Sequence, residues 1–164
     1  MKKLEITAEI INDLFRYEDG LLIRKVTITQ YARKGDVVGH VGNSGYMSCS
    51  IVGTMFLVHR AIFLMHHGYL PKYVDHIDGN RLNNRIENLR PATAIENAYN
   101  CKMSKNNTSG VKGVSWNKGT KKWEANINIA GVRFNLGHFE TLEKAKEAID
   151  VCRTEAHGKF ARHE

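Results

Sequence analysis

The sequence of 164 residues contains no uninterrupted run of about eighteen apolar residues, which is the length that a membrane-spanning helix requires. Its N-terminal residues, MKKLEITAEIINDLF, begin with lysines but soon reach Glu5, Glu9 and Asp13. They therefore lack the apolar region of a secretory signal peptide. We expect a protein that neither spans a membrane nor binds one, and that is not secreted.

Cysteine is scarce. Cys49, Cys101 and Cys152 lie far apart in the sequence and form no Cys-x-x-Cys pair. This spacing argues against a disulfide framework and against a structural zinc site. We expect the thiols to be small buried hydrophobic groups and the protein to be cytoplasmic, within the host cell if the sequence is viral.

The composition is otherwise that of a globular protein, since 42% of the residues are hydrophobic, which is enough for one average domain or two small ones. The net charge is +7, and it is uneven: residues 1–101 carry 12 Lys and Arg against 10 Asp and Glu, whereas residues 102–164 carry 12 against 7. A basic surface favours a polyanion, nucleic acid before membrane, although it can also serve solubility alone.

The N-terminal part of the sequence alternates turn signals with short apolar runs. Residues 1–13 indicate a short helix, and residues 14–56 indicate a small β-meander because EDG, RKGD, GNSG and VGT separate the runs. In residues 57–69 the apolar residues Val58, Ile62 and Met65 recur at helical spacing before Gly68, which predicts a helix with one buried face.

The next segment, VDHIDGNRLNNRIENL (residues 74–89), is rich in asparagine and poor in apolar side chains. We predict a short strand at residues 73–77, a long loop, and a second strand at residues 86–90 that Pro91 ends. Thr93 and Glu96 form a capping-box pattern that predicts a helix over residues 94–103.

Residues 102–108 are predicted to be a linker, and residues 109–164 to be a second domain. Three runs joined by glycine turns predict an antiparallel sheet in which Trp123, Ala125, Ile127 and Ile129 face one side. Val132, Phe134 and Leu136 are expected to face the same side. Thr141 should cap a helix whose stripe packs on that side, namely Leu142, Ala145, Ile149, Cys152 and Ala156. The predicted fold class is therefore α+β, with one helix on a three-stranded sheet at the C-terminal end.

The Asp75–His76 pair predicts hydrolytic chemistry on phosphate. A divalent cation such as Mg²⁺ prefers oxygen ligands, which Asp75 and Asn97 offer. His76 suits the removal of a proton from water, because its reference pKa lies near neutrality. Asn88, placed on the second strand, could orient the imidazole. Asn80, Asn83 and Asn84 are expected to hold the loop through bonds to the backbone.

The segment from Val74 to Asn100, with the helix before it, resembles the ββα-metal motif of HNH endonucleases of the phage and intron homing type. The resemblance implies that Asp75 and Asn97 bind a divalent metal, Mg²⁺ or Mn²⁺, that His76 is the general base and that Asn88 orients it. His59 could support this site or touch phosphate; alternatively, it is simply a packed, hydrogen-bonded histidine.

Residues 109–160 resemble the DNA-binding domain of plant ethylene-response factors, on the matching stretches GVKGVSW, KWEANI and VRFNLGHFETLEKAKEAID. This resemblance implies that the outer face of the sheet contacts the major groove of double-stranded DNA. The implied DNA-binding residues are Lys112, Ser115, Asn117, Asn126, Asn128, Arg133 and Asn135, with Lys118, Lys121 and Lys122 on phosphate. Glu124 is unexpected there, because its carboxylate would repel phosphate unless it accepts from a cytosine amino group.

The sequence thus predicts a metal-dependent endonuclease that hydrolyses phosphodiester bonds in duplex DNA. One site per chain predicts a nick from a monomer, or a double-strand break from a homodimer. Two alternatives remain open: a DNA-binding regulator whose nuclease motif is idle, and a nuclease that acts on RNA.

Overall fold

The computed structural model describes residues 5–164, which form two compact units, one ending at Ala92 and the other running from Thr93 to Glu164. No described helix is long and apolar enough to cross a membrane. The mixed α and β composition and the small antiparallel sheets agree with the predicted fold class.

The N-terminal unit begins with helix α1 (Ala8–Leu14), where the Thr7 side chain accepts from the N–H of Ile10. The predicted helix started at residue 1, and residues 1–4 lie outside the described part. Two antiparallel sheets follow in place of one meander. Strands β1 (Phe15–Glu18), β2 (Leu21–Arg24) and β3 (Val37–Val38) form the first, and β4 (His40–Val41), β5 (Met47–Ile51) and β6 (Thr54–Leu57) form the second.

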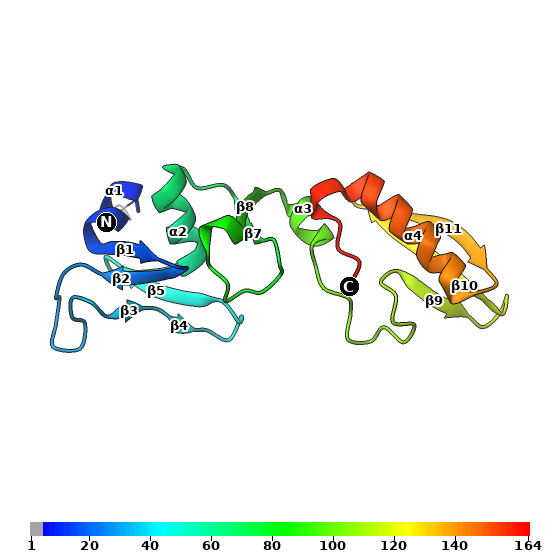
Figure 1. The fold of residues 1–164 in the computed structure, drawn as a ribbon, viewed down its shortest axis with the longest axis horizontal. Helices are drawn as coiled ribbons and strands as arrows, with labels where there is room; N and C mark the ends of the chain where they lie inside the picture. Colours follow the sequence, from blue (N-terminus) through cyan, green and yellow to red (C-terminus); the bar gives the residue numbers. More distant parts are fainter. Residues whose placement is uncertain (1–4) are drawn as a thin grey trace. The chain divides into compact units, whose positions relative to one another are not determined.

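Helix α2 (Val58–His67) supplies the centre of the N-terminal core (Figure 1). Its buried face carries Val58, Ala61 and Ile62, and it packs with Leu22 and Ile51 of the sheets in the same apolar cluster. Gly68 ends the helix in the left-handed conformation, with φ of 72°, as the sequence predicted. The helix therefore holds His59, which lies on the same buried face, inside the unit.

Strands β7 (Tyr73–His76) and β8 (Leu89–Ala92) form a two-stranded antiparallel ribbon. The predicted second strand at residues 86–90 is corrected, because residues Ile86–Asn88 form the 3-10 turn η1 before β8 begins. Pro91 does not end the strand but pairs with Val74. A ribbon of two strands leaves an outer edge on each strand, where the missing N–H of a proline is tolerated.

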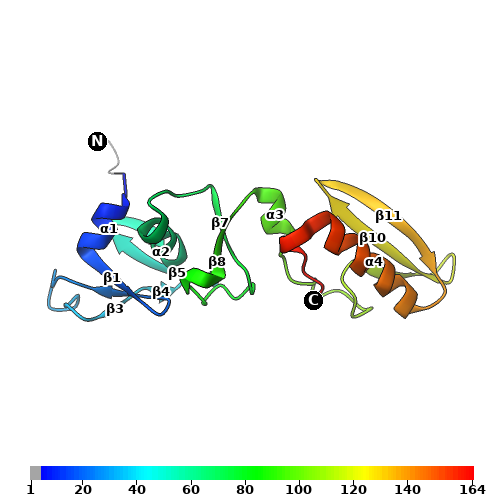
Figure 2. The same ribbon diagram turned by 45° about the horizontal axis from the view of Figure 1, so that its top comes forward.

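The C-terminal unit consists of helix α3 (Ala94–Tyr99), strands β9 (Val114–Asn117), β10 (Lys122–Ile129) and β11 (Val132–Phe139), helix α4 (Leu142–His157) and the turn η2 (Gly158–Phe160). β10 lies between β11 and β9 in the sheet, and α4 runs along one face of it (Figure 2). Ala125 packs with Ala145 and Ile149 of α4 in a small apolar core.

Two expectations for this unit are corrected. Val132 and Phe134 are 55% and 46% exposed, because the helix packs chiefly over β10 and the end of the β10–β11 hairpin stays uncovered by described residues. The buried position in the last turns of α4 is taken by Arg153, which is 2% exposed, rather than by Cys152. Arg153 is satisfied there because it donates to Asp150 Oδ1 at 3.0 Å and to the Lys112 carbonyl at 2.6 Å.

Helix α3 packs within the C-terminal unit, so the boundary lies before this helix and not in the predicted linker. The predicted capping box is present between Thr93 and Glu96. The Tyr99 ring stacks on His157 at 3.6 Å between centroids, and the Tyr99 hydroxyl accepts from the Ala130 N–H at 2.7 Å. Lys112 Nζ also donates to the carbonyls of Tyr99 and Cys101.

These contacts predict that Tyr99→Ala destabilises the C-terminal unit. An aromatic stack and a lost hydrogen bond are together worth about 1–3 kcal/mol. Trp116 and Trp123 are the two tryptophans of the chain, and both lie in this unit, so tryptophan fluorescence during urea unfolding reports on it selectively.

The urea midpoint should therefore fall for Tyr99→Ala and stay unchanged for Tyr31→Ala, which removes an 87% exposed tyrosine from the N-terminal unit. An unchanged tryptophan transition in Tyr99→Ala would mean that α3 does not belong to the C-terminal unit.

Candidate functional site

Asp75 and His76 end strand β7 and are both buried, with exposed fractions of 6% and 4%. Arg90 lies opposite Asp75 in the ribbon and contacts its Oδ2 atom through Nε and Nη2, each at 2.8 Å. A buried carboxylate requires such a partner, because the loss of hydration is costly without one. The ribbon register thus places a compensated acid directly beside the imidazole.

The His76 ring is held by a buried asparagine and two neighbouring rings. Its Nε2 atom lies 3.1 Å from Asn84 Oδ1, and the Asn84 side chain is almost completely buried. The His59 and Tyr46 rings lie 4.8 and 5.9 Å from the His76 ring, between centroids. In the tautomer that donates from Nε2 to this amide oxygen, Nδ1 is the basic nitrogen. Asn84 was predicted to bond the loop backbone. Its side chain instead contacts His76, the candidate general base.

Burial keeps both histidines neutral. Burial lowers the pKa of His76, against the opposing effects of the Asn84 hydrogen bond and of Asp78 and Asp75. Burial, with His76 and Arg60 nearby, lowers the pKa of His59 to about 3. His59 Nδ1 is buried and has no hydrogen-bond partner among the described residues. His59 thus contributes a neutral ring that packs beside His76 and does not compete with it for a proton.

Asp78 is the centre of the loop between the two strands. It accepts from the Asn80 N–H at 2.7 Å, from Asn83 Nδ2 at 2.7 Å and from Asn88 Nδ2 at 2.9 Å. Partial burial alone would raise the pKa of Asp78, but the hydrogen bonds from Asn83, Asn80 and Asn88 outweigh it and the pKa is lowered. The Asn80 side chain bonds the loop backbone at the Leu82 N–H, as predicted, whereas the Asn83 side chain bonds the Asp78 carboxylate instead. Asp78 was not identified from the sequence.

Asn88 closes the loop rather than contacting the imidazole. Its Oδ1 accepts from the Asp78 N–H at 3.0 Å, and its Nδ2 also donates to the Asn83 carbonyl at 2.8 Å. The expectation that Asn88 orients His76 by a direct hydrogen bond is therefore corrected, because both ends of its amide are engaged by the loop. Its influence on His76 passes through the loop conformation.

The loop is also tied to the N-terminal sheets. Arg81 Nη1 donates to the Ser44 carbonyl at 2.8 Å, and the Arg81 guanidinium lies 4.8 Å from the Tyr46 ring. On the other side, Arg85 Nη2 contacts Asp19 Oδ2 at 2.7 Å. Tyr46 could not be found from its local sequence, because only the fold brings the turn before β5 next to the loop.

The donors present suit a hard divalent cation. Asp75 offers carboxylate oxygens, and Arg90 contacts one of them through two nitrogen atoms. Among the described residues, no group of three or more His, Cys, Asp or Glu could hold a metal, so the remaining ligands would be amide oxygen, water or phosphate oxygen. Mg²⁺ is usually held in this way. Asn97 lies in α3, in the other compact unit.

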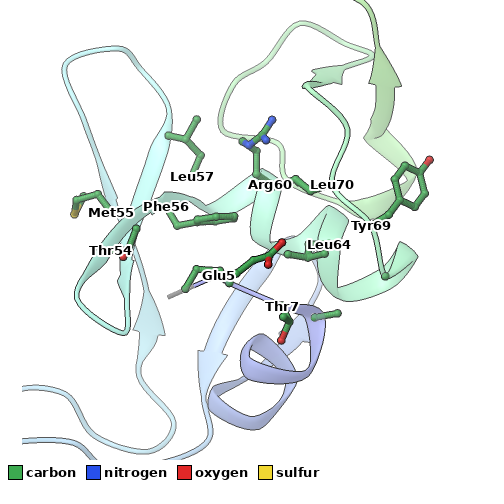
Figure 3. Close-up of a pocket in the computed structure, with 13 residues that line it drawn as sticks. Glu5, Thr7, Thr54, Met55, Phe56, Leu57, Arg60, Leu64, Tyr69 and Leu70 are labelled. Carbon is green, nitrogen blue, oxygen red and sulfur yellow. The ribbon is translucent and has the colours of Figure 1, made fainter. Parts of the chain in front are cut away.

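The N-terminal unit also contains a pocket of about 730 Å³ (Figure 3). The segments that line it are the start of α1, strand β6, and α2 with the residues that follow it. Arg60 contributes to the lining, but His59 and His76 are not among the described lining residues. This pocket is therefore not the candidate catalytic site.

The outer face of the C-terminal sheet carries a polar hollow of about 280 Å³. Predicted DNA-binding residues from three strands contribute to its lining, namely Ser115 of β9, Asn126 and Asn128 of β10, and Arg133 of β11. Asn107, Gly113 and Val114 complete it. The fold therefore brings together four of the residues that the sequence placed on this face.

The other predicted DNA-binding residues have different surroundings. Asn117 and Asn135 both donate to Glu124. Lys118 and Lys121 are exposed beside the β9–β10 turn, and Lys122 lies 3.9 Å from Glu140. Lys112 is half-buried, and its Nζ donates to two backbone carbonyls. Burial, with Arg153 nearby, lowers the pKa of Lys112 to about 8. Lys112 thus already has a structural role at α3.

Two family models match the chain. Residues 56–99 match HNH endonuclease, and residues 109–159 match the AP2 domain. The first match contains the β7–β8 ribbon and its loop, and the second contains the three-stranded sheet and α4.

Two relatives extend these matches. Protein 3.8 of Escherichia phage T7 is 42% identical over 106 residues, which are 63% of this chain and 87% of that protein. The Uncharacterized HNH endonuclease L560 of Acanthamoeba polyphaga mimivirus is 36% identical over 125 residues, which are 74% of this chain and 64% of that protein. A solved structure of the HNH homing endonuclease I-HmuI covers 85% of this chain and 82% of its own at 22% identity, but its TM-score of 0.39 is too low to establish a shared fold.

The buried His59 predicts a specific loss of stability in acid. Its pKa is about 3 in the folded protein and about 6.5 in an unfolded chain, so the unfolded state binds the extra proton between these values. The contribution of neutral His59 to the unfolding free energy is therefore fully present above about pH 6.5. It decreases as the pH falls, by about 2 kcal/mol between pH 7 and pH 5.

The measurement is the unfolding free energy from circular dichroism in urea at both pH values, for the unmodified protein and for His59→Gln, which cannot titrate. The variant should lose about 2 kcal/mol less on acidification. The tryptophan transition, which reports on the other unit, should respond equally in both proteins. Equal pH dependence of both unfolding free energies would contradict a buried neutral His59.

Proposed function

Because residues 56–99 match HNH endonuclease and residues 109–159 match the AP2 domain, we propose that the protein is a metal-dependent, homing-type endonuclease that nicks duplex DNA at a preferred site. The observation that supports this proposal most is the buried Asp75–His76 pair, with Asn84 fixing the ring.

In this proposal His76 removes a proton from the attacking water. Burial lowers its pKa, so the ring is neutral and ready to accept a proton at neutral pH. Asn84 on Nε2 leaves the lone pair on Nδ1, and Asn88 maintains the loop from which Asn84 approaches. A positioned base of this kind typically contributes roughly 10²–10⁴-fold to the rate.

Asp75 and Asn97 are the proposed ligands of a divalent cation, Mg²⁺ or Mn²⁺. Such a cation, when bound, stabilises negative charge on the phosphate and on the leaving oxygen. Arg90 holds the Asp75 carboxylate in place, through two contacts to one oxygen. The pairing of Asp75 with Asn97 is supported by the family resemblance and by the oxygen chemistry of the two side chains.

The AP2 domain is proposed to position the nuclease on its target. Ser115, Asn126, Asn128 and Arg133 line the hollow of the sheet and are the proposed base contacts. Lys118 and Lys121 lie in the turn before β10, and Lys122 begins that strand. All three are proposed to contact phosphate, which adds affinity without sequence preference. The chain carries one nuclease motif, so a monomer would nick, and a double-strand break would need two chains or two events.

The central test is nicking of supercoiled plasmid DNA with Mg²⁺, with Mn²⁺ and with EDTA. Nicked circles should accumulate with either cation and not with EDTA. His76→Ala should lower the rate by roughly 10²–10⁴-fold, because the base is lost, while the affinity for duplex DNA stays unchanged.

His40→Ala is the matched control, since His40 is an exposed histidine of the same unit, and it should nick at the normal rate. Metal-independent cleavage, or full activity of His76→Ala, would refute the catalytic assignment. Duplex binding without any nicking across diverse sequences would instead identify a DNA-binding regulator, and cleavage of structured RNA alone would redirect the activity to RNA.

A second test concerns Asn84, whose amide oxygen holds the general base. Asn84→Ala should lower the maximal nicking rate by less than the roughly 10²–10⁴-fold contribution of the base itself. Because the Asn84 hydrogen bond raises the pKa of His76, its loss should also move the acid limb of the pH–rate profile to lower pH.

Asn80→Ala is the control here, because Asn80 is an exposed asparagine of the same loop whose side chain accepts from the Leu82 N–H. It should leave the acid limb in place. A normal rate and an unmoved limb in Asn84→Ala would show that the ring is oriented by other groups.

A further inference from the structure

Glu124 is the acidic residue on the polar face of the sheet, and its carboxylate is the centre of a hydrogen-bond network. Oε1 accepts from Asn126 Nδ2 at 3.1 Å and from Asn135 Nδ2 at 2.7 Å, whereas Oε2 accepts from Asn117 Nδ2 at 3.1 Å. These amides come from all three strands, because Glu124 lies on the central one. The network therefore ties the polar face together across the sheet.

The orientation of two of these amides is set at both ends. Asn117 Oδ1 accepts from the N–H groups of Gly119 and Thr120, and Asn135 Oδ1 accepts from the Gly137 N–H. A backbone N–H can only donate, so each amide oxygen must face the backbone and each NH₂ must face Glu124. Asn117 and Asn135 are thereby used inside the sheet, and their amides are not available for two-point contact with a base.

Asn126 differs from them. Its NH₂ also faces Glu124, but its amide oxygen has no hydrogen-bond partner among the described residues. The side chain lines the polar hollow with Ser115, Asn128 and Arg133. Of the three asparagines that donate to Glu124, two are thus internal and one presents an acceptor to the hollow.

The carboxylate itself is largely compensated. Hydrogen bonds from Asn126 and Asn117 lower its pKa, and His138 and Arg133 add positive potential, so Glu124 stays ionised. His138 Nε2 lies 4.0 Å from Oε2. With three amides donating to it, Glu124 has little remaining need of a cytosine amino group, which was the alternative suggested by its position alone.

We propose that Glu124 is a specificity-determining residue that acts by positioning, and that it orients Asn126 to accept from a base amino group in the major groove. This inference rests on the proposed contact between the sheet and duplex DNA. Adenine and cytosine present such an amino group, whereas guanine and thymine present acceptors at the corresponding positions. Arg133, in the same hollow, offers the complementary donor for guanine.

The experiment selects bound sequences from a randomised duplex library with the full-length protein and with Glu124→Gln. The glutamine keeps the shape but replaces one acceptor oxygen with a donor, so the three amide NH₂ groups cannot all be satisfied. The variant should lose roughly 5-fold of its discrimination at one base position that prefers adenine or cytosine, which is the lower end of what a two-point contact contributes. Its affinity for random DNA should not fall, because a negative charge has been removed.

Glu147→Gln is the matched control, since it removes one charge from an exposed side chain of α4 in the same unit. It should retain the preferred sequence. Asn126→Ala is the second variant; it leaves the other bonds of Glu124 in place and should lose the same base preference. The slope of affinity against salt should be equal in all of these proteins, because no phosphate contact is changed.

The possible outcomes distinguish a wrong role for Glu124 from a wrong role for the sheet. A Glu124→Gln protein that keeps its preferred sequence and binds more tightly would show that Glu124 only repels phosphate, and would overturn the inference. If tryptophan fluorescence shows that this variant is unfolded, Asn126→Ala decides, and unchanged preference there overturns the inference as well. Failure of the unmodified protein to bind any duplex would instead refute the proposed role of the sheet.

Discussion

The conformation of the loop between β7 and β8 depends on Asp78. Without a carboxylate at this position, the amides of Asn83 and Asn88 and the backbone of Asn80 would lose their shared acceptor. Asn84 could then no longer be held against His76, because it belongs to the same turn. The chemistry of the site thus relies on a residue that need not touch the substrate, in the way that groups around a metal ligand control its orientation.

A carboxylate that accepts from several asparagine amides also occurs in the C-terminal sheet. Glu124 receives three amide donors, as Asp78 receives two amides and a backbone N–H, and in both places an ionised acceptor strengthens the bonds. The abundance of asparagine in both segments follows from this arrangement. A short amide can donate to a carboxylate and accept from a backbone N–H, which no aliphatic side chain can do. In both places, asparagine side chains link an acidic side chain to the neighbouring backbone.

The sequence predicted the parts of this structure that short-range rules control. The Thr93–Glu96 capping box, the end of α2 at Gly68 and the three strands of the C-terminal sheet are all present. It could not decide which asparagine meets His76, because Asn84 and Asn88 differ only in the direction that the loop backbone gives them. Arg153 was missed for a similar reason, since a helical stripe does not disclose that a carbonyl of a distant turn will accept from a buried guanidinium.

Helix α3 shows that the residues matched by a family model need not coincide with one compact folding unit. The HNH match extends to residue 99, yet α3 is fixed by the Tyr99–His157 stack and by Lys112, which belong to the unit of the AP2 domain. In the proposed mechanism this helix supplies Asn97. The Tyr99–His157 stack and Lys112 hold the helix that carries this amide, so we expect substitutions at Tyr99 or Lys112 to change the orientation of Asn97 within its own unit.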